Sequence, residues 1–177
     1  MNGEVFSRLY KEYIPVISYT TVDEVKNVAY VIYRLGIRAQ DLLDPGDRGF
    51  ETRVLVQKAV YFLQRLGLMR GYVFDLYLHG PYSTQLADDY MWLARKGDEY
   101  ISRVAEECAE CQKLDGLLEY LGEIDLRTLE VAATLAELAA VKGNLEEAKG
   151  LTRRIKPWVD DEDIVAALQV LKDLGLG

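Results

Sequence analysis

The chain has 177 residues, of which 50% are hydrophobic and 28% are charged, and its formal net charge is −8. This composition supplies enough apolar surface for a core and excludes long intrinsically disordered tracts. The negative charge disfavours nonspecific binding of nucleic acid or acidic membranes over the whole surface. We therefore expect a single globular domain over 1–177, with a helical lead-in over 1–45, a central helix–strand–helix unit over 50–97 and a helical part over 98–177.

The N-terminal segment carries charges where a secretory signal would need an apolar run, and no apolar stretch is long enough for a membrane span. We expect neither export nor membrane association. Together with only two cysteines, this indicates a cytoplasmic protein whose thiols are reduced. The scarcity of asparagine relative to leucine, glutamate and valine fits a thermophilic source.

The first part of the chain predicts a helix, a short strand and a second helix. Apolar residues at helical spacing indicate an amphipathic helix over 4–13, and the β-branched segment 14–20 is typical of a strand. Thr21 and Glu24 have the spacing of a capping box for a helix that Gly36 ends. Segment 41–51, which contains Pro45, Gly46 and charged residues, predicts a mobile loop.

The central unit predicts a broad apolar helix over 53–66, in which Gln57, Lys58, Tyr61 and residues 64–65 form the remaining, exposed polar strip. Segment 72–79 alternates between apolar and polar residues, as a half-buried strand does. A strand needs a partner, which we expect near 14–20 or in a second copy of the chain. Gly80 and Pro81 are expected to end this strand.

The remainder of the chain predicts helices. Ser83 or Thr84 caps a helix that ends at Gly97, and a long helix follows over 98–113. A short segment over 114–121 precedes three further helices, whose predicted caps are Asp125, Asn144 and Asp160. The predicted fold is mainly α, a compact bundle of about seven or eight helices with a minor β element.

Few residues form a pattern with chemical meaning. Cys108 and Cys111 have CxxC spacing, but on the apolar stripe of a predicted helix they are better explained as core cysteines than as a redox motif. A zinc site would need more ligands than two cysteines and His79, the one histidine of the chain. Adjacent acidic pairs such as Asp88–Asp89 are expected on solvated faces. We therefore expect neither a metal nor a cofactor.

His79 and Ser83 lie close together in the sequence and could form a catalytic dyad, which makes a hydrolase one alternative. The favoured interpretation is structural: Ser83 caps a helix and the His79 ring fixes the corner. A second alternative is a winged-helix-like nucleic-acid-binding regulator, although ordinary surface charge explains the basic residues better. Its candidate contacts form two clusters: Arg53, Lys58, Arg65 and Arg70, then Arg153 and Arg154.

The segments QKAVYFLQRLG and YVFDLYLHGPYSTQLADDY, which begin at Gln57 and Tyr72, resemble the YwgA-like proteins and, more distantly, the SocA/Panacea domain. The resemblance extends over roughly residues 50–175. The matching positions are Gln57, Lys58, Tyr61, Phe62, Gly80, Pro81, Tyr82 and Ser83. Panacea-type domains occur in antitoxins, so this resemblance implies action through protein contacts rather than catalysis.

We therefore expect a non-enzymatic interaction or regulatory module, antitoxin-like in the sense that a toxin is its partner. Aromatic anchors dominate protein interfaces. The expected contact surface comprises Lys58, Tyr61, His79 and Tyr82. Self-association into a homodimer, through a strand edge or an apolar helical face, is a further expectation.

Overall fold

A computed structural model describes residues 22–177 of the chain. These residues form helices with one small hairpin, so the expected mainly α fold with a minor β element is confirmed. The predicted helix over 4–13, the strand over 14–20 and Thr21 of the proposed capping box lie outside the described residues.

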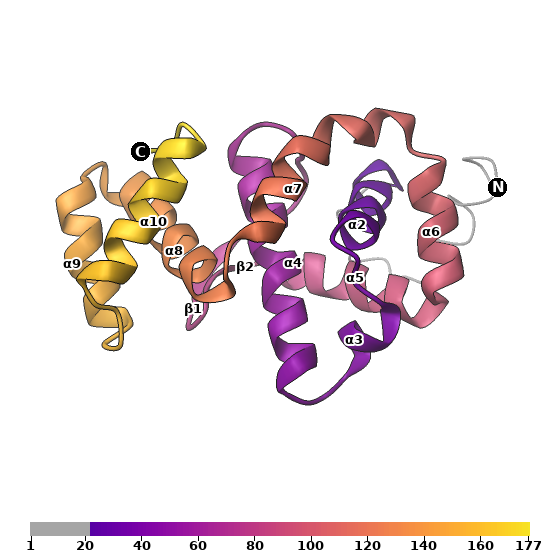
Figure 1. Cartoon of the computed structure of the whole chain (residues 1–177), viewed down its shortest axis with the longest axis horizontal. Helices are drawn as coiled ribbons and strands as arrows, with labels where there is room; N and C mark the ends of the chain where they lie inside the picture. Colours follow the sequence, from indigo (N-terminus) through magenta and orange to yellow (C-terminus); the bar gives the residue numbers. More distant parts are fainter. Residues whose placement is uncertain (1–21) are drawn as a thin grey trace.

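One group of helices surrounds α2 (Figure 1). The buried face of α2 is made by Val25, Val28, Ala29, Val31 and Ile32, and it packs against α4, α5, α6 and α7. The group consists of α2 (Val22–Arg34), α3 (Ala39–Leu43), α4 (Asp47–Arg65), α5 (Thr84–Lys96), α6 (Asp98–Glu106) and α7 (Asp115–Glu123).

A second group consists of α8 (Leu126–Lys142), α9 (Leu145–Ile155) and α10 (Asp161–Asp173). The predicted caps begin these helices: Asp125 accepts from Thr128 N, Asn144 from Glu146 N and Glu147 N, and Asp160 from Asp163 N. α8 also packs against α4, so the two groups share one continuous apolar core. Nine α-helices within 22–177 slightly exceed the expected number.

The extra helix comes from segment 41–51, where the prediction of a loop was wrong. α3 ends at Leu43 and α4 begins at Asp47, so the connection is only a few residues long. Gly49 lies in the first turn of α4, where an added Cβ would be 1.9 Å from Asp44 O. Arg53 Nη1 donates to Leu42 O at 2.9 Å and to Asp44 O at 2.7 Å. These long side-chain bonds and the close backbone approach order a segment whose composition is typical of a loop.

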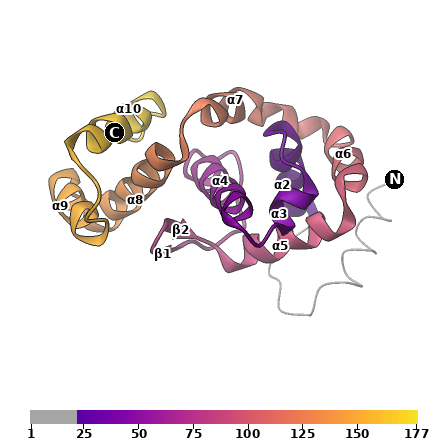
Figure 2. The same ribbon diagram turned by 60° about the horizontal axis from the view of Figure 1, so that its bottom comes forward.

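The strand prediction was correct in kind but wrong in extent, and the expected partner over 14–20 lies outside the described residues. β1 (Asp75–Tyr77) pairs antiparallel with β2 (Gly80–Tyr82), and Leu76 lies opposite Pro81. Pro81 was expected to end the strand, but each strand of a two-stranded sheet is an edge, where the missing N–H of proline is tolerated. Both views place this hairpin between α4 and α8 (Figure 2).

Candidate functional site

Two glutamines on α4 hold the chain on either side of the hairpin. Gln57 Nε2 donates to Ser83 O and Ser83 N donates to Gln57 Oε1, both at 2.9 Å. Seven residues later, Gln64 makes the same pair of bonds with Tyr72 N and Tyr72 O, again at 2.9 Å. Residues seven apart lie on one face of a helix. Each amide thus replaces the backbone partner that a neighbouring strand would provide.

Two buried lysines bind the carbonyl groups of the hairpin from beneath. Lys58 Nζ donates to Pro81 O at 2.7 Å, and Lys156 Nζ donates to Leu78 O at 2.6 Å. Lys156 also makes an ion pair with Glu130 of α8. The second carboxylate oxygen of Glu130 lies 3.4 Å from His79 Nδ1. The hairpin therefore rests on side chains from α4, from α8 and from the end of α9.

Gly80 permits this close packing. Its φ is +91°, and a Cβ on it would lie 2.7 Å from Thr134 Oγ1 and 3.4 Å from Lys58 Nζ. Thr134 is held there because its hydroxyl donates to Glu130 O at 2.8 Å. A left-handed glycine after a tight turn is a common way to close a hairpin. Gly80 thus serves both the turn and the close approach of the hairpin to Lys58 and Thr134.

Lys58 has an unusual environment for a lysine. Only 1% of the residue is exposed, and Pro81 O is the single hydrogen-bond acceptor recorded for its ammonium group within 22–177. Burial lowers the pKa of Lys58 to about 7; the Glu130 carboxylate opposes this shift and the positive charge of Lys156 adds to it. Glu130 makes its ion pair with Lys156, so among the described residues no carboxylate is left to pair with Lys58.

A pocket of about 440 Å³ opens between α4, α5 and the hairpin. Its walls are mainly apolar and aromatic, which is typical of binding pockets. Three basic side chains line it, Arg53, Lys58 and His79, and the lining contains no aspartate or glutamate. The remaining lining residues are Phe50, Val54, Gln57, Tyr77, Leu78, Gly80, Tyr82, Ala87, Tyr90 and Met91.

Of the four predicted partner-binding residues, the pocket brings together Lys58, His79 and Tyr82 but not Tyr61. The expectation that Lys58 and Tyr61 are exposed was wrong, because both are buried. Tyr61 OH donates to Glu137 Oε2 at 2.9 Å, and burial holds the pKa of Tyr61 well above its ordinary value. The side chain of His79 is 44% exposed, and Tyr82 is half-buried with its ring 5.3 Å from that of Tyr77.

The basic residues predicted for nucleic-acid binding do not behave as one group. Arg53 binds the backbone after α3, Arg65 lies 3.8 Å from Glu137, and Arg153 pairs with Asp161 at 2.6 Å. Lys58 is buried, whereas Arg70 and Arg154 are exposed. An arginine bonded to a carboxylate or carbonyl has fewer donors for phosphate, so this arrangement gives no added support to a nucleic-acid interface.

His79 and Ser83 have separate contacts. Ser83 is fully buried, and its Oγ accepts from Leu86 N at 3.3 Å as the cap of α5. The His79 ring contacts Glu130 and packs against the Phe50 ring, with 4.8 Å between the centroids. No hydrogen bond between His79 and Ser83 is recorded in the described part of the chain. The helix-capping role expected of Ser83 is confirmed.

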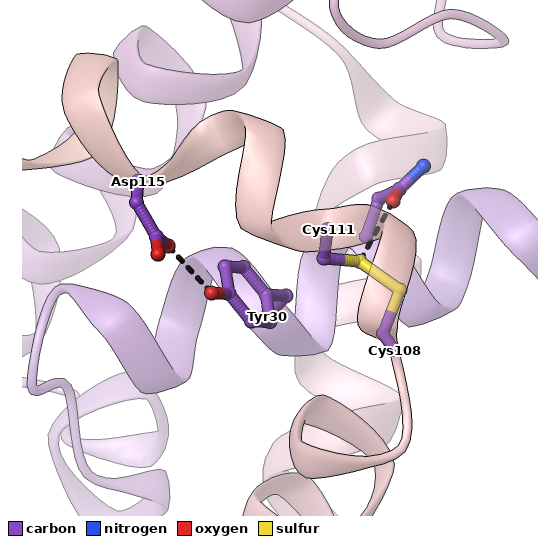
Figure 3. The surroundings of a disulfide bond; sticks show 5 residues. Tyr30, Cys108, Cys111 and Asp115 are labelled. Atoms are coloured by element: carbon purple, nitrogen blue, oxygen red, sulfur yellow. Dashed lines mark hydrogen bonds between the residues drawn. A yellow bond between two sulfur atoms is a disulfide. The ribbon is translucent and has the colours of Figure 1, made fainter.

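Two expectations about acidic and sulfur-containing side chains need correction. Asp89, placed on a solvated face by the sequence, is fully buried and accepts from Tyr72 OH at 2.7 Å. The cysteines are buried as expected, but Cys108 and Cys111 form a disulfide (Figure 3). The structure therefore contains an oxidised cysteine pair in place of the reduced thiols on which the expected cytoplasmic location was based.

The predicted helix over 98–113 was also wrong, because it breaks at this disulfide. α6 ends at Glu106, and a 3₁₀ helix, η1 (Ala109–Leu114), leads into α7. The change of direction lets both α6 and α7 pack against α2. Tyr30 of α2 donates a hydrogen bond to Asp115 at the start of α7 (Figure 3). Arg34 Nε lies 3.0 Å from the same carboxylate.

The sequence alone missed several residues of the site. Phe50 belonged to the predicted loop, and Glu130 and Lys156 lie 51 and 77 residues beyond His79 in a chain without any motif that joins them. Tyr77 and Leu78, at the tip of the hairpin, belong to a segment that the sequence did predict as a strand. The prediction of a half-buried strand gave no reason to expect both side chains to be exposed.

Residues 22–177 contain no helix that combines the length and apolar character needed to cross a bilayer. Within the same range, no cluster of histidine, cysteine, aspartate and glutamate side chains has a metal-binding arrangement. Comparisons with protein-family models, with curated proteins and with solved structures find no significant match to this chain.

Proposed function

We propose that this chain is a protein-interaction module whose docking surface is the hairpin and the mouth of the pocket beside it. The docking surface comprises Phe50, Val73, Leu76, Tyr77, Leu78, His79 and Tyr82. The regulatory, toxin-neutralising role implied by the resemblance is the finer form of the same proposal. A toxin would then be the partner that covers this surface.

The observation that carries the proposal is the concentration of exposed apolar side chains at this one place. Five of the eleven large hydrophobic residues exposed within 22–177 belong to the docking surface: Phe50, Val73, Leu76, Tyr77 and Leu78. Leu78, at the tip of the turn, is 71% exposed. Four of the five lie within residues 73–78, and the Phe50 ring packs against that of His79 at the turn. Exposed apolar residues gathered in one part of a folded domain often mark an interaction site.

Rigidity makes this surface suitable for recognition. The hairpin backbone is fixed by Gln57, Lys58 and Lys156, so little conformational entropy remains to be lost when a partner binds. Tyr77 and Tyr82 pack edge to face, which also fixes the orientation of two aromatic side chains. Aromatic anchors next to a pocket are the usual energetic centre of an interface.

Affinity capture from the native host tests the proposal. The tagged wild-type chain should retain a stoichiometric partner, and the double substitution Tyr77→Ser with Leu78→Ser should release it. Val141→Ser is the matched control, because Val141 on α8 has the same 71% exposure as Leu78 and lies outside the docking surface. Equal retention of the partner by all three proteins would refute the proposal.

A further inference from the structure

We infer that the pocket receives the C-terminal end of a partner polypeptide, with an apolar side chain in the pocket and the terminal carboxylate on Lys58. This inference rests on the proposed function, since it names the part of the partner that the docking surface recognises. The observations behind it are the unpaired buried cation, the charge of the lining residues and the shape of the site.

The unpaired cation is Lys58. A buried ammonium group is costly unless a counter-ion compensates it. No carboxylate lies within ion-pair distance of Lys58 among the described residues, and Glu130 is already bonded to Lys156. Burial has lowered the pKa of Lys58 to about 7, which is the response expected when compensation is missing. An incoming anion would supply it.

The charges that line the pocket select the sign of the ligand. The whole chain has an excess of acids, with 29 aspartates and glutamates against 21 lysines and arginines. Yet the pocket has Arg53, Lys58 and His79 in its lining and no acidic residue. Arg53, together with Lys58 in its protonated form, therefore favours an anion in the pocket, even though the chain as a whole has a net negative charge.

The apolar walls select the rest of the ligand. Phe50, Val54 and Met91 offer contacts to an aliphatic or aromatic group, and a pocket of about 440 Å³ has room for one or two residues. A polypeptide C-terminus carries a carboxylate and an apolar side chain on the same carbon. Only one segment of backbone has to enter the pocket when the ligand is a chain end. An aspartate or glutamate inside a chain would bring backbone on both sides of it to the pocket.

Binding of the carboxylate should depend on pH, because it needs the protonated form of Lys58. The groups that face Lys58 come from several elements: Arg53 on α4, His79 and Tyr82 on the hairpin, Tyr90 on α5, Glu130 on α8 and Lys156 after α9. A bound carboxylate raises the pKa of Lys58, so complex formation takes up a proton near pH 7. Affinity should therefore fall as the pH rises above 7.

The experiment compares fluorescein-labelled pentapeptides that end in Leu or Phe, each with a free carboxylate or a carboxamide, by fluorescence anisotropy on the full chain. The free acids should bind at least 10-fold more tightly than the amides at pH 6. This preference should shrink at least 10-fold by pH 9. Lys58→Met should abolish the preference, and Lys172→Met, at an exposed position on α10 outside the pocket, should keep both the preference and its pH dependence.

Lys58→Met also removes the bond to Pro81 O, so it could fail to fold. Val54→Trp, which fills the pocket and leaves Lys58 in place, is the second variant and should weaken the free acids at least 10-fold. Equal binding of acids and amides, or a preference that Val54→Trp leaves unchanged, would overturn the inference. N-acetyl-phenylalanine binding as tightly as the pentapeptides would also overturn it in favour of a free small acid.

The two proposals fail in different ways. If Tyr77→Ser with Leu78→Ser releases the captured partner while acid and amide peptides bind alike, the docking surface stands and the chain-end inference falls. If the Tyr77→Ser with Leu78→Ser variant retains the captured partner as well as the wild type does, while free acids still bind more tightly than amides, the pocket binds carboxylates but the proposed interaction module is refuted.

Discussion

At the scale of single residues, Lys58 has the environment that a soluble domain usually avoids. Its ammonium group is held by one backbone carbonyl, and the nearest carboxylate is bonded to another lysine. Such a residue lowers the stability of the free protein, since burying an unpaired charge is unfavourable. Unfavourable burial of a titratable group often accompanies a binding site.

The unfavourable burial of Lys58 should make the free energy of unfolding depend on pH. Unfolding returns the pKa of Lys58 from about 7 to its ordinary value of 10.5, so between these pH values the unfolded state binds more protons than the folded state. The free energy of unfolding should then rise with pH above 7, by up to about 1.4 kcal/mol per pH unit. Urea unfolding of the wild type between pH 7 and pH 9.5 should show the rise, and Lys58→Met should lose it.

Buried tyrosines such as Tyr61 set the upper limit of this pH window. Above pH 10, the ordinary pKa of tyrosine, the unfolded state loses the Tyr61 proton while the folded state keeps it, so the free energy of unfolding falls as the pH rises. Lys172→Met, at an exposed position on α10, is the control and should follow the wild type. A slope that is identical in all three proteins would show that Lys58 is not the group that titrates.

Gly80 provides a second prediction at this scale. Gly80→Ala forces a Cβ into a left-handed backbone and against Thr134 Oγ1, so we expect a loss of about 3 kcal/mol or more. Gly143→Ala has a similar positive φ but no atom within 4 Å of the added Cβ, so only the backbone term of about 1–2 kcal/mol applies. Chemical denaturation of the two variants measures the difference; equal losses would remove the packing role of Gly80.

At the scale of elements, the hairpin depends on α4 more than on its own strands. Two strands of three residues are too short to be stable alone. Gln57 and Gln64 supply a backbone-like partner on each side of the hairpin, and Lys58 and Lys156 bind its turn. The Gln-Lys pair on the helix and the His-Gly-Pro-Tyr-Ser corner are thus one structural unit.

Substitution of the two glutamines tests this unit. Gln57→Leu leaves the buried N–H of Ser83 without its partner, while Ser83 O keeps its bond from Ala87 N, for an expected loss of about 1–3 kcal/mol. Gln64→Leu acts on a partly exposed site and should cost about 1–2 kcal/mol. Hydrogen exchange should show the Ser83 amide exposed in Gln57→Leu and unchanged in Gln112→Leu, an exposed control. Protection of Ser83 in both variants would contradict the role of Gln57.

At the scale of the whole molecule, α8 connects the two groups of helices. It packs against α9 and α10 on one side and against α4 and the hairpin on the other. Glu130 on α8 joins Lys156 to His79, so the polar cluster beneath the hairpin spans the same junction. The proposed docking surface therefore lies where the two groups meet: its residues belong to α4 and the hairpin segment, and Glu130 and Lys156 support it from the second group.

This arrangement predicts one cooperative unfolding transition, because a shared core links both groups of helices. Scanning calorimetry should record a single peak. Reduction of the Cys108–Cys111 disulfide, which closes a four-residue loop, should remove about 2 kcal/mol and lower the midpoint by roughly 4–8 °C without splitting the peak. A Cys108→Ala with Cys111→Ala variant should not respond to reductant. Two peaks, or a shift in only one of them, would show two independent units.

The amino-acid sequence by itself determined the helical class, most helix ends and the presence of a strand within 72–79. These features follow from local patterns: periodic apolar residues, caps such as Ser83 and Asp125, and left-handed glycines such as Gly143. The same local patterns did not predict α3, because the order of this segment depends on the hydrogen bonds of Arg53 and on the close backbone approach at Gly49.

Only the tertiary structure decided what the polar residues of α4 do. Gln57 and Lys58 are hydrophilic and lie between apolar residues, so a local pattern assigns them to the surface. Their partners, Ser83 O and Pro81 O, are backbone atoms more than twenty residues away, and backbone atoms carry no sequence signal. The Glu130–Lys156 pair joins two further elements at long range. For that reason the sequence pointed to the right segment, whereas the pocket and its unpaired lysine emerged only from the packing of α4, α5 and α8 around the hairpin.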